Sequence, residues 1–240
     1  MEILFENEKV VVVNKPAGML IHDDGTGRQE TVVNWVKERY PEIKDVGEDV
    51  RIRTGEMVKK PGIVHRLDKD TTGVLIIVKD QETFLHIKGQ FKIHSVEKIY
   101  HAFVYGNVKE SEGEIDRPIG KNRNDFRKYS AQRGARGILR EAQTFFRVLG
   151  KTENGSATFM ELKPKTGRTH QIRVHMKAVH HPVVADRLYA PKGEKILGFN
   201  RLALHARSIS FRLTDGQQVS VEAPYPEDFE RALVEIKTLW

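Results

Sequence analysis

The sequence has 240 residues, with 40 Lys and Arg against 33 Asp and Glu, which gives a formal charge of +7 and a pI near 9.5. It contains no cysteine, which excludes disulfides, thiolate catalysis and Cys-ligated metal sites, and its longest apolar run, 74–78, is far too short to span a membrane. We therefore expect a soluble, cytoplasmic protein with a single domain over residues 1–240, and the basic pI favours a polyanionic partner such as nucleic acid.

In chain order, the first half of the sequence contains short strands with helices interspersed. Apolar and β-branched residues predict strands over 9–13, 73–78 and 98–105. Thr31 and Asp80 are favourable N-caps, and each predicts a helix that starts directly after it. The polar stretch between the first helix and the second strand predicts a loop over 42–60.

The second half is dominated by hairpins. Asn154-Gly155 and Asp215-Gly216 are hairpin turns between strand-like segments, which are 141–149 with 157–163 and 208–213 with 218–222. Apolar periodicity predicts helices over 169–179 and 226–239, the latter with Phe229, Leu233 and Ile236 inward. Hairpins without regular βαβ alternation predict an α+β fold built around a mostly antiparallel sheet.

The positive charge is concentrated in residues 117–140, which we call the basic segment. It holds eight Lys and Arg residues against one acid, Asp125, and the rest of the chain carries no net charge. One interpretation is an arm or ribbon that binds phosphates, with Phe126 and Tyr129 available for stacking. The other interpretation is a solvated loop that adds solubility.

Several common motifs of chemistry are absent from the sequence. There is no dinucleotide fingerprint, P-loop, nucleophile elbow or HExxH, and the ten histidines form no set with metal-ligand spacing. We therefore expect no nucleotide cofactor and no metal.

Two segments combine reactive residue types in compact surroundings. Residues 61–78 read PGIVHRLDKDTTGVLIIV, where Asp68 is either a turn residue or a carboxylate that reacts with a sugar carbon. Residues 165–176 read KTGRTHQIRVHM, where Arg168 either binds phosphate or a carboxylate, or belongs to an exposed helix cap.

Together, HRLDKDTTG and TGRTHQIRVHM resemble the RluA-type family of RNA pseudouridine synthases. Four further matches are KPAGMLIH at 15–22, Lys98-Ile99-Tyr100 before VYG, HPVVADRLY at 181–189 and LHA at 204–206. The chain departs from the family pattern at Thr72, where many relatives have Ser, and at Ala185, where Gly is common.

The resemblance implies a fold and a reaction. It implies a mixed, mostly antiparallel central sheet flanked by helices, with a cleft across the sheet. It also implies a stand-alone catalytic domain without the small N-terminal RNA-binding domain that relatives often carry. The family isomerises uridine in RNA to pseudouridine without redox cofactor or ATP. The expected partner is large-subunit rRNA or tRNA, and the expected oligomeric state is a monomer.

The resemblance also assigns roles to residues. Asp68 is the essential carboxylate, which attacks the anomeric carbon, adds to ring carbon six or removes a sugar proton. Arg168 pairs with it, and Tyr100 packs on the target base. Arg66 fills the space of the flipped nucleotide, and Leu204 forms an apolar floor. The remaining candidate RNA contacts are Lys98, His65, Arg123, Arg127 and Lys128. His65 and His205 fit structural or RNA-contacting roles better than catalytic ones.

Two functions from other classes compete with this interpretation. A catalytically idle RNA-binding or RNA-folding protein on the same fold is one, although the intact set of Asp68, Tyr100 and Arg168 argues against it. A nucleoside or glycoside hydrolase would release free uracil, but no second carboxylate stands at a known spacing.

Overall fold

The structure is a computed structural model, and it describes residues 1–23, 30–51, 55, 57–132 and 135–238. The chain divides into two compact units. The first unit comprises residues 1–97 and 208–224, and the second comprises residues 98–207 and 225–240.

The first unit is built around two largely buried strands. β2 (Val10–Lys15) pairs antiparallel with β1 (Glu2–Glu6) on one side and with β5 (Thr72–Val78) on the other. All residues of β5 are buried, as expected of an apolar strand covered on both faces. The β2–β5 register places Lys15 opposite Gly73, so the segment before β5 lies beside the turn that follows β2.

The helices of the first unit start where the sequence predicts. α1 (Val32–Arg39) is capped by Thr31, whose hydroxyl accepts the Asn34 amide, and α2 (Gln81–Lys92) is capped by Asp80, whose carboxylate accepts the Thr83 amide. The predicted loop over 42–60 is wrong in part. It contains a short helix, η1 (Pro41–Ile43), and a hairpin of β3 (Asp49–Arg51) and β4 (Met57–Lys59), whose three-residue strands are too short for a period to emerge.

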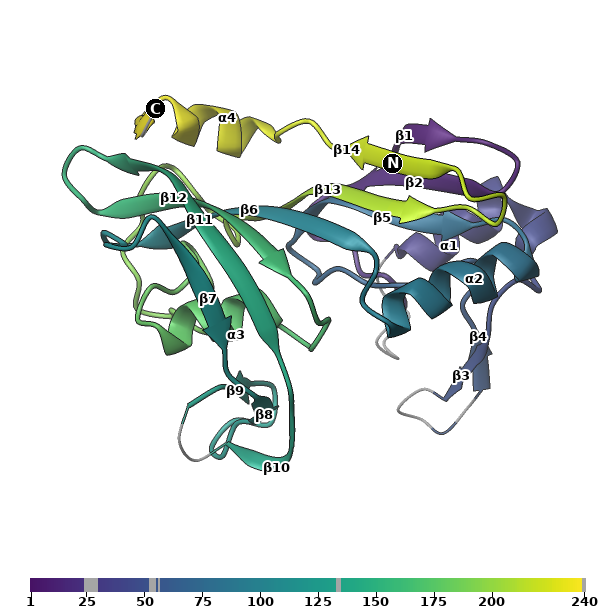
Figure 1. Ribbon diagram of the computed structural model, residues 1–240, viewed down its shortest axis with the longest axis horizontal. Helices are drawn as coiled ribbons and strands as arrows, with labels where there is room; N and C mark the ends of the chain where they lie inside the picture. The colour runs from purple at the N-terminus through teal and green to yellow at the C-terminus, as the bar shows by residue number, and fades with distance from the viewer. Residues whose placement is uncertain (24–29, 52–54, 56, 133–134, 239–240) are drawn as a thin grey trace. The chain divides into compact units, whose positions relative to one another are not determined.

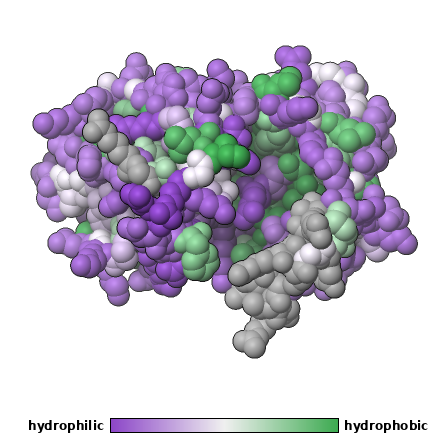
Figure 2. Space-filling view, turned by 90° about the horizontal axis from the view of Figure 1, so that it is seen from below, coloured by the Kyte–Doolittle hydropathy of each residue, from purple (hydrophilic) through white to green (hydrophobic). Residues whose placement is uncertain are grey.

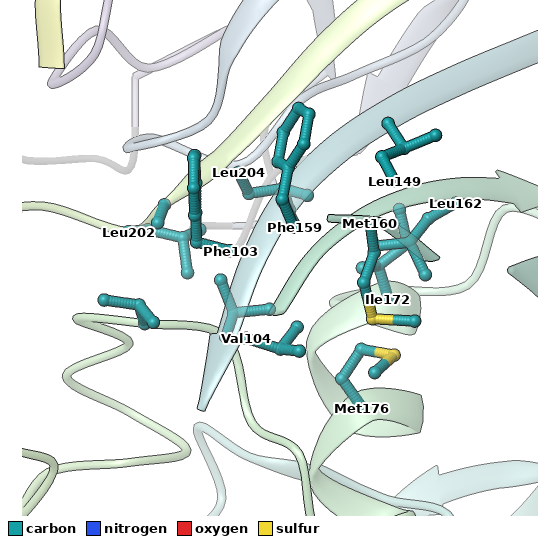
Figure 3. Close-up of a cluster of buried hydrophobic side chains, with 14 of the residues drawn as sticks. Phe103, Val104, Leu149, Phe159, Met160, Leu162, Ile172, Met176, Leu202 and Leu204 are labelled. Carbon is teal, nitrogen blue, oxygen red and sulfur yellow. The ribbon is translucent and has the colours of Figure 1, made fainter. Parts of the chain in front are cut away.

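The second unit is also built on antiparallel strands. β12 (Ala157–Pro164) lies between β6 (Glu97–Tyr105) and β11 (Gln143–Thr152), and the far edge of β11 pairs with β7 (Glu112–Asp116) and with β15 (Ile236–Thr238). Helix α3 (Gln171–Ala178) packs Ile172 and Met176 against Met160 and Leu162 of β12, as Figure 3 shows. The hairpin prediction at Asn154-Gly155 is confirmed.

β13 (Leu204–Arg212) starts in the second unit and ends in the first, where it forms the second predicted hairpin with β14 (Gln218–Glu222). The C-terminal prediction is wrong in part. α4 (Glu227–Leu233) buries Phe229, but the chain then forms β15, because residues 236–238 pair with 150–152 of β11. A neighbouring strand edge therefore overrides the helical period of this segment.

The basic segment contains three short antiparallel strands. β8 (Ile119–Lys121) lies between β10 (Arg136–Arg140) and β9 (Tyr129–Ser130) in a separate three-stranded sheet, which Figure 1 shows below the ends of β7 and β11. Residues 133–134 lie outside the described residues.

Both units confirm the α+β class with mostly antiparallel pairing. In the space-filling view, hydrophilic side chains cover most of the face shown, and apolar side chains form small separate patches (Figure 2). Among the described residues, no helix has the length and the apolar content to cross a membrane.

Candidate active site

Asp68 lies on a short turn that leads into β5. It follows the buried Leu67, its own side chain is half-buried, and its carbonyl accepts the Thr71 amide at 3.2 Å. Asp68 is therefore both the turn residue that local sequence suggests and a carboxylate at a fixed place in the first unit.

Lys15 ties this turn to the preceding motif. Its side chain is fully buried, and its ammonium donates to the carbonyls of Pro16 at 2.7 Å, Met19 at 3.0 Å and Lys69 at 2.9 Å. The Lys69 carbonyl also accepts the amide of Gly18 at 2.9 Å, and Gly18 has a φ of +83° that favours glycine. The KPAGM turn and the residue directly after Asp68 are thus joined by two donors to a single carbonyl.

His65 fastens the other end of the same segment. Its Nε2 accepts the backbone amide of Ile76 in β5 at 2.9 Å, so this nitrogen is the unprotonated one. The ring stacks on Phe91 of α2, with centroids 4.9 Å apart. These contacts favour a structural role for His65, and its contact with RNA stays a prediction.

Cations gather on the same unit near Arg66. Arg66 is exposed, and burial together with the neighbouring charges of Lys60 and Arg66 lowers the pKa of His22 to about 4. Burial and Arg66 also lower the pKa of Lys60. Lys60 and Arg66 are therefore close enough to His22 to act on its charge, and Asp23 acts on it in the opposite direction.

In the second unit, Lys98 and Tyr100 stand two residues apart on β6, so both side chains point to the same face of the sheet. Tyr100 is opposite Leu162, and burial lowers the pKa of the Lys98 ammonium to about 8. The Phe103 amide donates to the Ala203 carbonyl at 3.1 Å, which brings the start of β13 beside β6. Leu204 is buried in the core of this unit (Figure 3).

Arg168 belongs to the turn between β12 and α3. Its Nε donates to the Glu141 carbonyl at 2.9 Å, and its backbone amide donates to the side-chain oxygen of Gln171 at 3.0 Å. Buried Gln171 also accepts from the Thr166 hydroxyl at 2.6 Å and donates to the Gln143 carbonyl at 2.9 Å. One amide side chain therefore sets the path of the turn that presents Arg168.

The HPVVADRLY motif anchors α3 through a buried ion pair. Arg173 donates to both oxygens of Asp186, at 2.7 and 2.9 Å, and the same carboxylate accepts the amides of Leu188 and Tyr189. Ala185, just before it, has a φ of +57°, which explains why glycine is common there. The departure at Ala185 is therefore accommodated with a strained backbone.

The cations of the basic segment have different surroundings. Arg117 donates to the Ala178 carbonyl at the end of α3, so it is part of the fold. Arg127 donates to both oxygens of Asp125, at 3.0 and 2.9 Å, and this pair holds the pKa of the Asp125 carboxyl well below its usual range. Lys128 lies 3.6 Å from the same carboxylate, whereas Arg123 is exposed.

The predicted site residues thus form two groups. The first unit brings together His65, Arg66 and Asp68, and the second holds Lys98, Tyr100, Leu204 and Arg168. The pairing of Arg168 with Asp68 stays a prediction. In the part of the chain that the structure describes, no group of three or more His, Asp or Glu residues is arranged to hold a metal ion.

Two residues that hold the turns of Asp68 and Arg168 were not predicted from the sequence, namely Lys15 and Gln171. The signal for Lys15 was present, because a lysine ends a strand of four buried valines directly before a Pro/Gly turn. Gln171 had no such signal, since its partners come from β11 and from the turn before α3.

Residues 9–178 match the family model described as RNA pseudouridylate synthase. The chain is 36% identical over 238 residues to an uncharacterised RNA pseudouridine synthase of Synechocystis sp., which covers 99% of this chain and 69% of that protein. It is 34% identical over 244 residues to ribosomal large subunit pseudouridine synthase D of Pseudomonas aeruginosa, covering 95% and 69% of the two chains. Human RNA pseudouridylate synthase domain containing 1 has a similar structure, with a TM-score of 0.76, 26% identity and coverage of 100% of this chain and 89% of that one.

Proposed function

The chain belongs to the RNA pseudouridylate synthase family, and from this premise we propose that it isomerises specific uridines of large-subunit ribosomal RNA in a reaction that depends on Asp68. Enzymes of this family are isomerases that convert uridine in RNA to pseudouridine. The choice of substrate rests on relatives that are named for the large ribosomal subunit. A tRNA substrate is the alternative.

The reaction rearranges one nucleotide without consuming another reactant. The bond between N1 and the anomeric carbon breaks, a bond between C5 and that carbon forms, the proton on C5 leaves, and N1 gains a proton. The target base must first leave the stack, which costs a few kcal/mol. The group that starts the reaction must therefore be positioned to meet one flipped nucleotide.

The turn that carries Asp68 is held in place, which supports the proposed role of this carboxylate. The buried ammonium of Lys15 donates to the Lys69 carbonyl, directly after Asp68, and His65 accepts the Ile76 amide of β5. These contacts hold the turn of Asp68 and are the observation that carries the proposal. In the proposed reaction, Asp68 attacks the anomeric carbon, adds to ring carbon six or removes a sugar proton. Arg168 would keep it ionised, since a cation within about 4–6 Å lowers a carboxyl pKa.

Tyr100 and Arg66 have supporting roles in the proposal. Tyr100 packs on the target base and assists removal of the C5 proton at the end. Arg66, exposed on the Asp68 segment, fills the space that the flipped base leaves. Leu204 lies within the core at the start of β13 and is proposed as the apolar floor under the base.

The decisive experiment replaces Asp68 with Asn. We expect Asp68→Asn to abolish pseudouridine formation on total RNA, read by a pseudouridine-specific chemical modification, while RNA affinity is retained. Asp70→Asn, on the same turn, is the matched control and should retain most of the activity. Full activity in Asp68→Asn would refute the role of Asp68. Binding by the wild-type protein without isomerisation would favour the idle RNA-binding protein, and release of free uracil would favour the hydrolase.

The substrate is tested in cells by mapping pseudouridine in total RNA with and without the gene. Loss of one or more sites in large-subunit rRNA is the expected result. Loss confined to tRNA would contradict the proposed substrate while leaving the reaction intact.

We further propose that the basic segment grips the substrate RNA. Combined replacement of three of its cations by Ala should weaken RNA binding and lower the slope of log affinity against log salt by about 2–3. Isomerisation of RNA that is already bound should not change. The three replaced residues are Arg123, Arg127 and Lys128. An unchanged salt slope would instead support the interpretation of the basic segment as a solvated loop that adds solubility.

A further inference from the structure

A separate cavity of about 270 Å³ lies in the second unit, between the basic segment and α3. Its floor is apolar and is formed by Val174 and Ala178 of α3 together with Leu188 from the segment after Asp186. β9 forms the opposite wall. Of the candidate catalytic and RNA-contacting residues named above, Lys128 and Tyr129 line this cavity.

The wall formed by β9 contains backbone groups that can hydrogen-bond to a ligand. β9 is an edge strand of the three-stranded sheet. The Lys128 carbonyl accepts the Asn122 amide and so faces β8, whereas the Tyr129 amide donates to the Tyr189 hydroxyl at 3.0 Å on the outer side. Because the N–H and C=O of one strand residue point to the same side, the Tyr129 carbonyl faces outward too. A planar group with a donor at its edge would find an acceptor there.

The rim of the cavity is positively charged. Lys128 and Lys177 line it, and no carboxylate is among its described lining residues, although Asp125 lies 3.6 Å from Lys128 outside that lining. Lys177 is exposed in the last turn of α3, and Lys128 is partly exposed directly before β9. An apolar slot with cations at its mouth matches a nucleobase with flanking phosphates.

The size of the cavity restricts the ligand further. Pockets for drug-sized molecules span roughly 300–1,000 Å³, so this one takes a single planar base and not a base pair or a folded motif. We propose that the cavity binds one unpaired nucleobase of the substrate RNA, distinct from the uridine that is isomerised, with its flanking phosphates at Lys128 and Lys177. This inference rests on the proposed function, because it takes RNA as the ligand.

The pocket is tested in the full chain by NMR, with methyl-labelled Val and Leu. Titration with 5′-AMP and 5′-UMP should shift the Val174 and Leu188 methyl signals, whereas inorganic phosphate should not. Lys177→Ala should weaken nucleotide binding several-fold and lower the salt slope of RNA binding by about one. Lys92→Ala is the matched control, because Lys92 is likewise exposed in the last turn of a helix but does not line the cavity.

The outcomes separate this inference from the proposed function. Equal shifts with inorganic phosphate would reduce the site to an anion site and refute a base pocket. If the Val174 and Leu188 methyl signals do not shift with either nucleotide in a protein that forms pseudouridine, the base pocket is refuted and the proposed function stands. Conversely, Asp68→Asn should keep both methyl shifts, so an active Asp68→Asn variant with a responsive pocket would refute only the role of Asp68.

Discussion

Replacement of Lys15 by Met tests whether the buried ammonium holds the Asp68 turn. Met keeps the length and apolar stem of the side chain but cannot donate a hydrogen bond. In wild type, the ammonium donates to three carbonyls, and only that of Lys69 has a second donor among the contacts described above, the Gly18 amide. The variant therefore leaves the Pro16 and Met19 carbonyls without this donor.

The magnitude follows from those two carbonyls. Pro16 is exposed and Met19 is half-buried, so the relevant quantity is the hydrogen bond that each carbonyl loses. A hydrogen bond to a charged group contributes about 1.5–3 kcal/mol, hence about 3–6 kcal/mol for the pair. Part of this is offset because the variant no longer buries an ammonium, whose desolvation is itself unfavourable. We expect the free energy of unfolding to fall by about 2–4 kcal/mol. Since the turn of Asp68 loses one of its fastenings, kcat should fall at least tenfold while RNA affinity changes little.

Urea unfolding and single-turnover kinetics on one RNA measure both effects. Lys69→Met is the matched control, because Lys69 contributes its carbonyl to the network while its own side chain is exposed. The control should retain stability and kcat. A Lys15→Met protein with the stability and kcat of wild type would refute the argument, and lost stability with unchanged kcat in the folded fraction would confine Lys15 to the fold.

Three further expectations follow from the structure. Arg173→Met should lower the free energy of unfolding by about 3–5 kcal/mol, because the fully buried Asp186 would lose its only ion-pair partner among the described residues. Arg231→Met is the control at an exposed ion pair, and it should lower the free energy of unfolding by less than about 1 kcal/mol in the same urea assay. Ala185→Gly should raise stability by about 1 kcal/mol, since a φ of +57° strains Ala, and an unchanged or lower Tm would contradict this. Burial lowers the pKa of His101 to about 4, so the unfolded chain binds a proton at a higher pH than the folded chain does. Tm should therefore fall as the pH is lowered from 6.5 toward 4, and His101→Gln should make that fall shallower. An equal dependence of Tm on pH in the variant and wild type would contradict this role of His101.

Local sequence was sufficient for much of the fold. Thr31 and Asp80 cap their helices because a side-chain oxygen three residues before an amide can satisfy it without help from the rest of the chain. The two hairpins formed where Asn154-Gly155 and Asp215-Gly216 allow a tight turn. The motif around Asp68 likewise identified the family from the order of its residues.

Tertiary structure decided what local patterns could not encode. The end of the predicted C-terminal helix became β15 because β11 offered it an unpaired edge. Lys15 and Gln171 hold turns in place because they donate to carbonyls that lie far away in the sequence. The Lys69 carbonyl, for example, is 54 residues from Lys15. The sequence determined the family, whereas only the folded chain decided which buried side chains hold the Asp68 turn in place, since hydrogen bonds across long separations leave no period in the sequence.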